Sequence, residues 1–112
     1  MSVDSSVFGI LSGRERTEKL LGRAAVSIAG HDAGKIYFIV GVVNAGLRDE
    51  MILLADGRAR KTAKPKAKKA MHLRVLPIRS ERVAEALIAG RSVDDSVIVH
   101  ELKSVRLDPD CD

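Results

Sequence analysis

The sequence predicts a mainly β fold followed by a helical tail. Between Gly22 and Leu76, short β-branched and apolar segments alternate with turns rich in Gly, Asn and Asp, a pattern typical of small β domains. From Ser80 onward the apolar residues recur at helical spacing instead. Hydrophobic residues make up 46% of the 112 residues and aromatic residues only 3%. We therefore expect one domain with an aliphatic core.

Residues 1–21 are expected to form a flexible or partly helical N-terminal segment. Residues 1–13 are rich in Ser and Gly, which favours a frayed chain end. Residues 14–21 alternate in charge and end in two leucines, so they predict one or two helical turns that stop at Gly22. An extended lead-in fits the same residues.

Three extended segments follow, each bounded by a turn. Val26 and Ile28 alternate with small or polar neighbours, which is the period-two pattern of a half-buried strand. Residues 36–43 are β-branched and aromatic, and Gly41 among them indicates a bulge or sharp bend. Residues 51–55 form the third segment. Short strands at this spacing favour a small barrel over an open sheet.

A basic region continues the β pattern. Asp56-Gly57 is a hairpin signal, so residues 58–62 are expected to form a fourth, basic strand. Four of the six residues 64–69 are lysine, which predicts an extended, solvated arm, so that the basic arm as a whole covers residues 58–69. Residues 71–76 alternate again and predict a last strand, which Pro77 ends. The β domain is thus expected to cover residues 22–78.

Residues 79–106 are expected to form a tail of one or two helices. Ser80 is a candidate N-cap with Glu81 in the first turn, and Gly90 is a candidate C-cap. The apolar residues at helical spacing between them are Val83, Ala84, Leu87 and Ile88.

A second helix would begin near Ser92 or Asp94 and bring three apolar residues to one face. These are Ile98, Leu102 and Val105. Residues 97–99 fit a strand equally well, so the pattern leaves helix and strand open after Val97. Residues 107–112 predict an acidic, disordered end.

The excess positive charge of the chain lies in one segment. The chain has 19 Lys and Arg against 15 Asp and Glu, a net charge of +4. Between Asp56 and Glu81 there is no carboxylate, and without the basic residues of that stretch the net charge would be −5. The nine are Arg58, Arg60, Lys61, Lys64, Lys66, Lys68, Lys69, Arg74 and Arg79. A block of like charge repels itself unless a polyanion neutralises it, so this stretch predicts contact with a nucleic-acid backbone.

Residues 22–43 resemble the KOW motif of ribosomal proteins and transcription factors. The matching residues are 26–30 (VSIAG), Gly34-Lys35 and the apolar strand through Val40. Two glycines spaced by four close a short loop between antiparallel strands, and at least one is expected to take a positive φ. The loop tip is then expected to present backbone N–H groups and Lys35 to a phosphate.

The residues that follow strengthen the resemblance. Residues 53–61 (LLADGRARK), 64–69 (KPKAKK) and His72-Leu73 are similar to small bacterial KOW-domain RNA-binding proteins. Those proteins are relatives of archaeal and eukaryotic large-subunit ribosomal proteins. The resemblance covers residues 22–76, and it implies a five-stranded SH3-like barrel that binds RNA without catalysis. It also implies that the RNA is ribosomal RNA of the large subunit.

One departure concerns the loop between the two glycines. The family often carries basic residues there, whereas this chain has His31, Asp32 and Ala33. The expected contacts therefore move to Lys35 and to the basic arm. The predicted RNA-binding residues are Lys35, Arg58, Arg60, Lys61, Lys64, Lys66, Lys68, Lys69 and His72, with Gly30 and Gly34 shaping the turn.

No pattern in the sequence predicts an enzyme, a metal site or a cofactor. Asp94 and Asp95 are adjacent, and on a helix their side chains diverge by about 100°. Three scattered histidines and the single cysteine, Cys111, give no zinc spacing, and one cysteine fits a reducing cytoplasm. No apolar stretch approaches the roughly 18–20 residues of a membrane span, and the N-terminus lacks the basic start of a signal peptide.

The leading hypothesis is a cytoplasmic, ribosome-associated RNA-binding protein with a role in translation, which contacts phosphates through its basic strand and arm. Recognition is expected to be of shape, because few aromatic residues are present for stacking. One alternative is a protein-interaction module that docks ribosomal or transcription proteins. In that module the helical tail docks the partner. Alternatively the tail, which has a net charge of −4 from Ser80 onward, folds back on the basic stretch and masks it. A DNA-binding module is the other alternative, because charge alone does not distinguish DNA from RNA.

Overall fold

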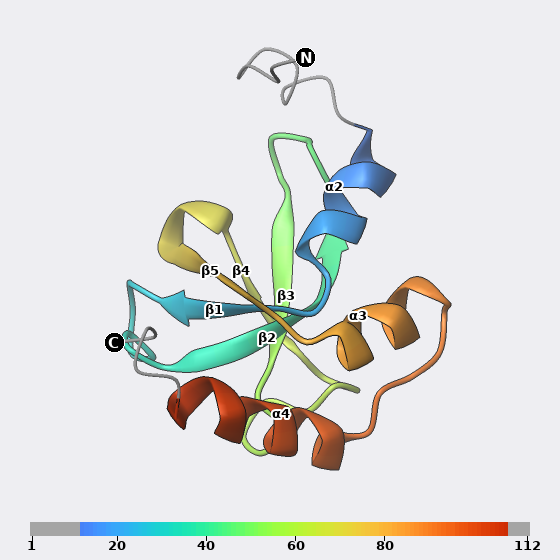
Figure 1. Cartoon of the computed structure of the whole chain (residues 1–112). Coiled ribbons are helices and arrows are strands. Elements are labelled where there is room, and N and C mark those ends of the chain that lie inside the picture. Colours follow the sequence, from blue (N-terminus) through green and yellow to red (C-terminus); the bar gives the residue numbers. More distant parts are fainter. Residues whose placement is uncertain (1–11, 108–112) are drawn as a thin grey trace.

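Five antiparallel strands form one sheet in the order β4-β3-β2-β1-β5 (Figure 1). The structure is a computed structural model, and it describes residues 12–107. The strands are β1 (Arg23–Ser27), β2 (Ile36–Val43), β3 (Met51–Ala55), β4 (Lys66–Lys68) and β5 (Leu73–Arg79). The helices are α2 (Gly13–Leu20), α3 (Glu81–Ile88) and α4 (Asp95–Leu107), with a short 3-10 helix η1 (Ala70–His72) before β5. The expected mainly β domain with a helical tail is confirmed.

Strand β2 bends in the middle and serves both halves of the sheet. Its first half pairs with β1, where Phe38 lies opposite Ala24, and its second half pairs with β3, where Val43 lies opposite Met51. The register with β3 shifts between Ile39 and Gly41, so the bulge expected at Gly41 is confirmed. Because of this bend, β3 runs across the direction of β1 and β5 in Figure 1.

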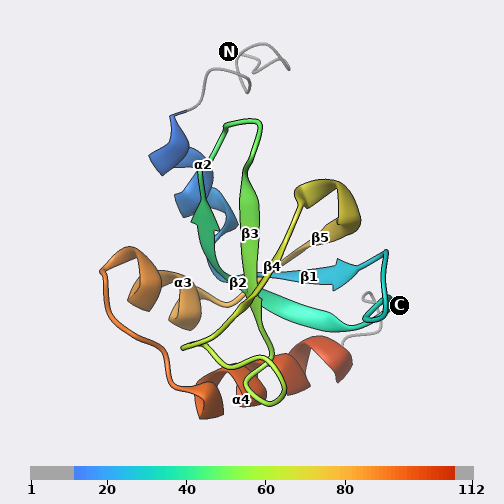
Figure 2. The same ribbon diagram turned by 180° about the vertical axis from the view of Figure 1, so that it is seen from behind.

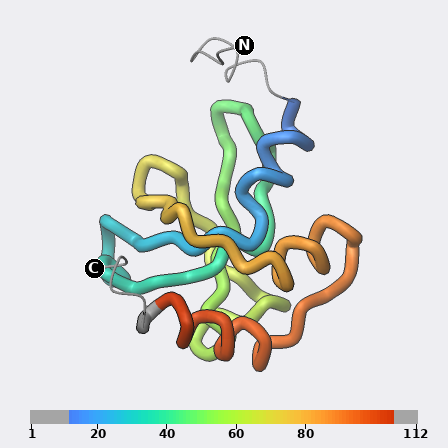
Figure 3. Tube along the Cα trace, viewed as in Figure 1, coloured from blue at the N-terminus to red at the C-terminus, as the bar shows by residue number. Residues whose placement is uncertain are grey.

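The two faces of the sheet pack into two separate apolar clusters. Ala25, Tyr37 and Ile39 belong to a cluster held between the strands, together with buried residues of β3 and Leu73 of β5. The alternate residues Ala24 and Phe38 face the other way, as the period of two requires. They pack against α3 and α4, which lie on one side of the sheet (Figures 1 and 3). The helical tail therefore completes the core.

Helices are present in the segments where the sequence predicts them, and the expected caps of α3 at Ser80 and Gly90 are confirmed. Helix α2 begins after Ser12, whose Oγ accepts a hydrogen bond from the Glu15 amide. The Oγ of Ser80 likewise accepts a bond from the Val83 amide at the start of α3, and Gly90 beyond its end has a φ of 78°. Residues 97–99 lie within α4, so the alternative of a strand there is wrong.

Two expectations about the strands are corrected. Residues 58–62 do not form the fourth strand, because the carboxylate of Asp56 accepts hydrogen bonds from the amides of Arg58 and Arg60 and folds the chain into a loop. The fourth strand is β4 instead, inside the segment expected to be a solvated arm; it pairs with β3, with Ala67 opposite Leu53. Figure 2 shows the chain looping beside α4 before β4 crosses the sheet.

The last strand also differs from its expected extent. It was expected to end at Pro77, but β5 continues to Arg79. Strand β5 lies at the edge of the sheet and pairs only with β1, so the missing amide hydrogen of Pro77 costs no bond to a neighbouring strand. Met71 and His72, expected at the start of this strand, belong to η1.

Some expectations fall on residues that the structure does not describe. The frayed chain end over residues 1–11 and the acidic end over residues 108–112, including Cys111, lie outside the described residues. Ser12 and Gly13, which were expected in the frayed segment, belong to the cap and first turn of α2. None of the described helices is long and apolar enough to cross a membrane.

Candidate nucleic-acid interface

The loop between β1 and β2 has the two-glycine geometry that the sequence predicts. Gly30 and Gly34 have φ values of 85° and 92°, which side chains rarely adopt. The amides of Ala33 and Gly34 donate to the carbonyl oxygens of Gly30 and Ser27, at 3.2 and 2.7 Å. The amide of Lys35 also donates within the loop, to the backbone carbonyl oxygen of Asp32. These three amides therefore close the turn and are not presented to a phosphate as expected.

The side chain of Asp32 points inward and is the centre of a polar network. Its carboxylate accepts hydrogen bonds from the hydroxyls of Ser27, at 2.8 Å, and Tyr37, at 2.9 Å. The ammonium groups of Lys68 and Lys66 lie 2.5 and 2.9 Å from its two oxygens. Only 5% of Asp32 is exposed. Asp32 thus attaches the β1–β2 loop to β4.

The network sets the ionisation of its members. Burial by itself would raise the pKa of the Asp32 carboxyl, but the hydrogen bonds from Lys68, Lys66, Ser27 and Tyr37 outweigh burial and hold that pKa far below its usual range. Burial and the bond to Asp32 raise the pKa of Tyr37 to about 12. Asp32 is therefore charged at neutral pH, and Tyr37 stays protonated and donates to it.

Lys68 and Lys66 share a single carboxylate, so two positive charges meet one negative charge and the cluster keeps one net positive charge. The Lys68 side chain is only 10% exposed, and its ammonium also donates to Ser27 Oγ and to the Ala29 carbonyl, both at 2.7 Å. The Lys66 side chain is 26% exposed. These two residues were predicted to bind RNA from a mobile arm. The structure places them on a paired strand with a carboxylate between them.

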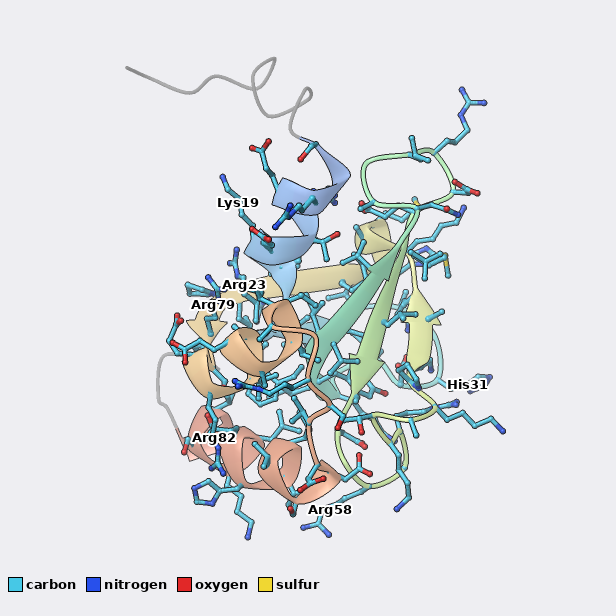
Figure 4. All side chains as sticks on the ribbon, turned by 90° about the vertical axis from the view of Figure 1, so that its right-hand side faces the viewer. Lys19, Arg23, His31, Arg58, Arg79 and Arg82 are labelled. Carbon is cyan, nitrogen blue, oxygen red and sulfur yellow. The ribbon has the colours of Figure 1, made fainter. Side chains whose placement is uncertain are left out.

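Three other predicted residues lie on the loop between β3 and β4. Arg58, Arg60 and Lys61 are exposed, and the loop that carries them is held at both ends. Asp56 anchors its start through the two amide bonds described above. The amide of Thr62 donates to the carboxylate of Asp95 at the start of α4, at 2.8 Å. Figure 4 shows Arg58 at the end of the molecule beside α4.

The remaining predicted residues lie at the two ends of β4 and beside β1. Lys64 precedes β4 and Lys69 follows it, and both are exposed. Lys35 and His72 are both exposed. They lie on opposite sides of the chain at the end of β1: the carbonyl oxygen of Lys35 accepts a hydrogen bond from the Ser27 amide, and the carbonyl oxygen of His72 accepts one from the Ile28 amide. We call the exposed set Lys35, Arg58, Arg60, Lys61, Lys64 and Lys69 the outer cations; His72 is exposed beside them.

The outer cations have no acidic partner in the described part of the chain. None of the ion pairs or side-chain hydrogen bonds found among residues 12–107 involves one of their side chains. In one alternative predicted from the sequence, the acidic tail covers the basic side chains of this surface. It does contact the β3–β4 loop, but through the Thr62 amide and through Gly57, whose Cα faces the Asp95 carbonyl. The charged side chains of the loop are left exposed.

The charge pattern identified most of the exposed cations but missed the network that divides them. Ser27 and Tyr37 were not predicted as parts of a site, and Asp32 was treated only as a departure from the family pattern. Alternation offered one signal, because Lys66 and Lys68 are two residues apart and a strand places them on one face. The spacing alone does not show that this face is covered, nor which residue covers it. Among the described residues, no three His, Cys, Asp or Glu side chains gather as a metal site would require.

Comparison with known proteins adds no family to this description. No protein-family model matches the chain, and no curated protein is significantly similar to it.

Proposed function

We propose that this chain is an RNA-binding protein that contacts the phosphate backbone through its outer cations. The observation that carries the proposal is the exposure of these side chains on two neighbouring loops and both ends of β4, without an acidic partner in residues 12–107. Cations held at fixed positions favour binding to a regular array of phosphates, because each contact releases condensed counterions.

The fold of the domain supports the same proposal. A bent β2 shared by two halves of a sheet, β1 at the centre of one half and a short 3-10 helix before β5 fit a small SH3-like barrel of the KOW type. Tyr37 and Phe38 are only 2% and 1% exposed, so neither is available to stack on a base. Binding is therefore to the shape and charge of folded RNA more than to base identity.

The proposed partner is ribosomal RNA of the large subunit, and the proposed location is the cytoplasm. Both rest on the resemblance of residues 22–76 to KOW-domain proteins. Sedimentation of a cell lysate through sucrose gradients tests them directly. The chain should migrate with the large subunit at low salt and leave it at high salt, whereas absence from every ribosomal fraction would exclude this partner.

A pair of matched triple variants tests the RNA-binding surface. Fluorescence anisotropy with a structured RNA should be recorded from about 50 to 300 mM salt. R58Q/R60Q/K61Q should weaken binding about tenfold or more and reduce the slope of log K against log salt by about 2 to 3, because each lost phosphate contact removes about 0.7 to 0.9.

The control removes three exposed charges elsewhere. R82Q/R91Q/K103Q alters side chains of α3, α4 and the segment between them, and Figure 4 shows Arg82 on the side away from His31. This control should keep the wild-type slope. If both triple variants lose the same affinity and the same slope, then RNA binding depends on the net charge of the protein and not on the position of the outer cations. Binding to a DNA duplex as tight as to RNA would favour a DNA-binding module.

A second candidate function is a protein-interaction module, and one groove favours it. The groove has a volume of about 260 Å³ and lies between the sheet, the segment before β4 and the link from α3 to α4. Its apolar lining includes Val40, Leu53, Pro65, Leu87 and Val93. A protein partner that remains bound to the immobilised chain after nuclease treatment, and is lost in Leu87→Asp, would support this candidate over RNA binding.

A further inference from the structure

The carboxylate of Asp32 is surrounded by donor groups from three segments of the chain. Two hydroxyl donors and two ammonium groups converge on its carboxylate, all within 2.9 Å, and the carboxylate is almost fully buried. Carboxylate and phosphate oxygens accept the same charge-assisted hydrogen bonds from lysine and hydroxyl groups. The four donors therefore form an anion site, and the chain occupies it with a side chain of its own.

The position of this site makes its occupation relevant to RNA. Lys66 and Lys68 lie on β4, directly between the exposed Lys64 and Lys69. Without Asp32, four lysines would be available along six residues. With it, the ammonium of Lys68 is saturated by three acceptors, namely Asp32, Ser27 Oγ and the Ala29 carbonyl.

We propose that Asp32 acts as an internal substitute for a phosphate, which occupies the Ser27–Tyr37–Lys66–Lys68 site and withholds these two lysines from RNA. The proposal rests on the RNA-binding function above and restricts the phosphate contacts to the outer cations.

Two double variants on the same short segment test which lysines meet phosphate. K64Q/K69Q and K66Q/K68Q each remove two positive charges, so net charge is matched. In the salt titration K64Q/K69Q should reduce the slope by about 1.5 to 2, whereas K66Q/K68Q should leave it within error. Equal reductions would overturn the proposal while leaving RNA binding intact. If K66Q/K68Q does not fold by circular dichroism, D32N/K66Q/K68Q also removes the unpaired carboxylate. This variant lowers the net charge by only one, so K64Q, with an expected slope reduction of about 0.7 to 0.9, is its charge-matched comparison.

A second experiment probes the site without RNA. Asp32→Ser removes the carboxylate and leaves Lys66 and Lys68 facing an empty position. Inorganic phosphate at about 20 mM, compared with chloride at equal ionic strength, should raise the unfolding temperature of the D32S variant by several degrees more than that of the wild type. An equal shift in the two proteins would overturn the anion site. Asp32→Ala, which also leaves the position empty, provides the same comparison if D32S does not fold.

The outcomes separate the two proposals. If the wild type does not bind RNA, the proposed function fails, and the phosphate experiment still decides whether the site exists. If RNA binds and D32S steepens the salt slope by about 2, because two more lysines become available, then the masking role is supported. An unchanged slope in a folded D32S variant would overturn it.

Discussion

The carboxylate of Asp95 accepts a hydrogen bond from the Thr62 amide, at 2.8 Å, and thereby joins the first turn of α4 to the basic loop. The bond connects the acidic tail to the segment that carries Arg58, Arg60 and Lys61. Because it uses a backbone amide, the tail fixes the position of the loop and leaves its charges exposed. The helical tail is thus a support for the candidate interface.

The same contact predicts a strong effect of Gly57→Ala. Gly57 has a φ of 80°, and a Cβ there would lie 2.5 Å from the Asp95 carbonyl oxygen. The left-handed conformation costs a side chain about 1–2 kcal/mol, and forcing the helix away costs about 1–3 kcal/mol more. We expect the free energy of unfolding, measured with urea, to fall by about 2–5 kcal/mol.

Gly46→Ala is the matched control for this substitution. Gly46 has a φ of 81°, but nothing lies within 4 Å of the position of its Cβ. This variant should therefore lose only the conformational part, about 1–2 kcal/mol. If the two alanine variants are equally destabilised, then contact with α4 does not constrain the loop.

Acid should destabilise the protein in part through Asp32. Its pKa in the folded state is far below the value of about 3.9 for an unfolded carboxyl. The stability that it contributes is therefore complete above about pH 5 and is lost as the pH falls through 4 and below. Urea unfolding at pH 7, 5 and 3 should show D32N less stable than the wild type at pH 7, with the difference narrowing toward pH 3.

Glu50 is expected to add an acid-sensitive contribution of the same sign. The hydrogen bond from Arg16 lowers the pKa of Glu50 against the effect of burial, and a bond from the Gly46 amide helps. Glu50→Gln should therefore also become closer to the wild type as the pH falls. A D32N difference that stays constant from pH 7 to 3 would mean that the charge of Asp32 is not what stabilises the network.

The periodicity of the apolar residues predicted most of the fold. The distribution of charged residues predicted less of the candidate site. The bend at Gly41, the cap at Ser80 and the buried face of α4 follow from local pattern and backbone preference. The fourth strand was misplaced because Asp56 captures two amides of the residues expected to form it, which depends on the turn actually adopted. Propensity does not show such a choice.

The division of the cations also lay beyond local pattern. Asp32 and Lys68 are 36 residues apart and meet only because β4 and the β1–β2 loop come together in the folded sheet. Burial of a carboxylate is unfavourable unless partners surround it, and those partners come from three separate segments. Charge counting therefore grouped Lys66 and Lys68 with Lys64 and Lys69, although the structure places them in different environments.

Ser80→Ala should test how α3 is joined to α4. Ser80 Oγ accepts from the Val83 amide at 3.2 Å and donates to Glu101 of α4 at 2.5 Å, and the residue is buried. Loss of an N-cap costs about 0.5–2 kcal/mol, and loss of the second bond leaves Glu101 without this donor. We expect a loss of about 2 kcal/mol or more in the free energy of unfolding.

The exposed cap of α2 is the comparison for Ser80. Ser12 makes the equivalent bond to the Glu15 amide, but it is exposed and α2 contains no buried residue. Ser12→Ala should therefore cost about 0.5 kcal/mol. A cost for S80A no larger than that for S12A would show that the bond to Glu101 does not contribute to stability.

Leu102→Ala should show whether the tail belongs to the core. Leu102 is 2% exposed and packs in the cluster that includes Phe38 of β2 and Val83 of α3. Removing a buried leucine side chain costs about 2–5 kcal/mol, since apolar contacts are lost and a cavity remains.

The neighbouring Lys103 is exposed, so Lys103→Ala should change stability by no more than about 0.5 kcal/mol. We expect a single cooperative urea transition, which moves to lower urea concentration in L102A. Circular dichroism and the amide exchange of β2 should both follow this same transition. A first transition confined to the helices, with β2 still protected, would instead make the tail a separate unit.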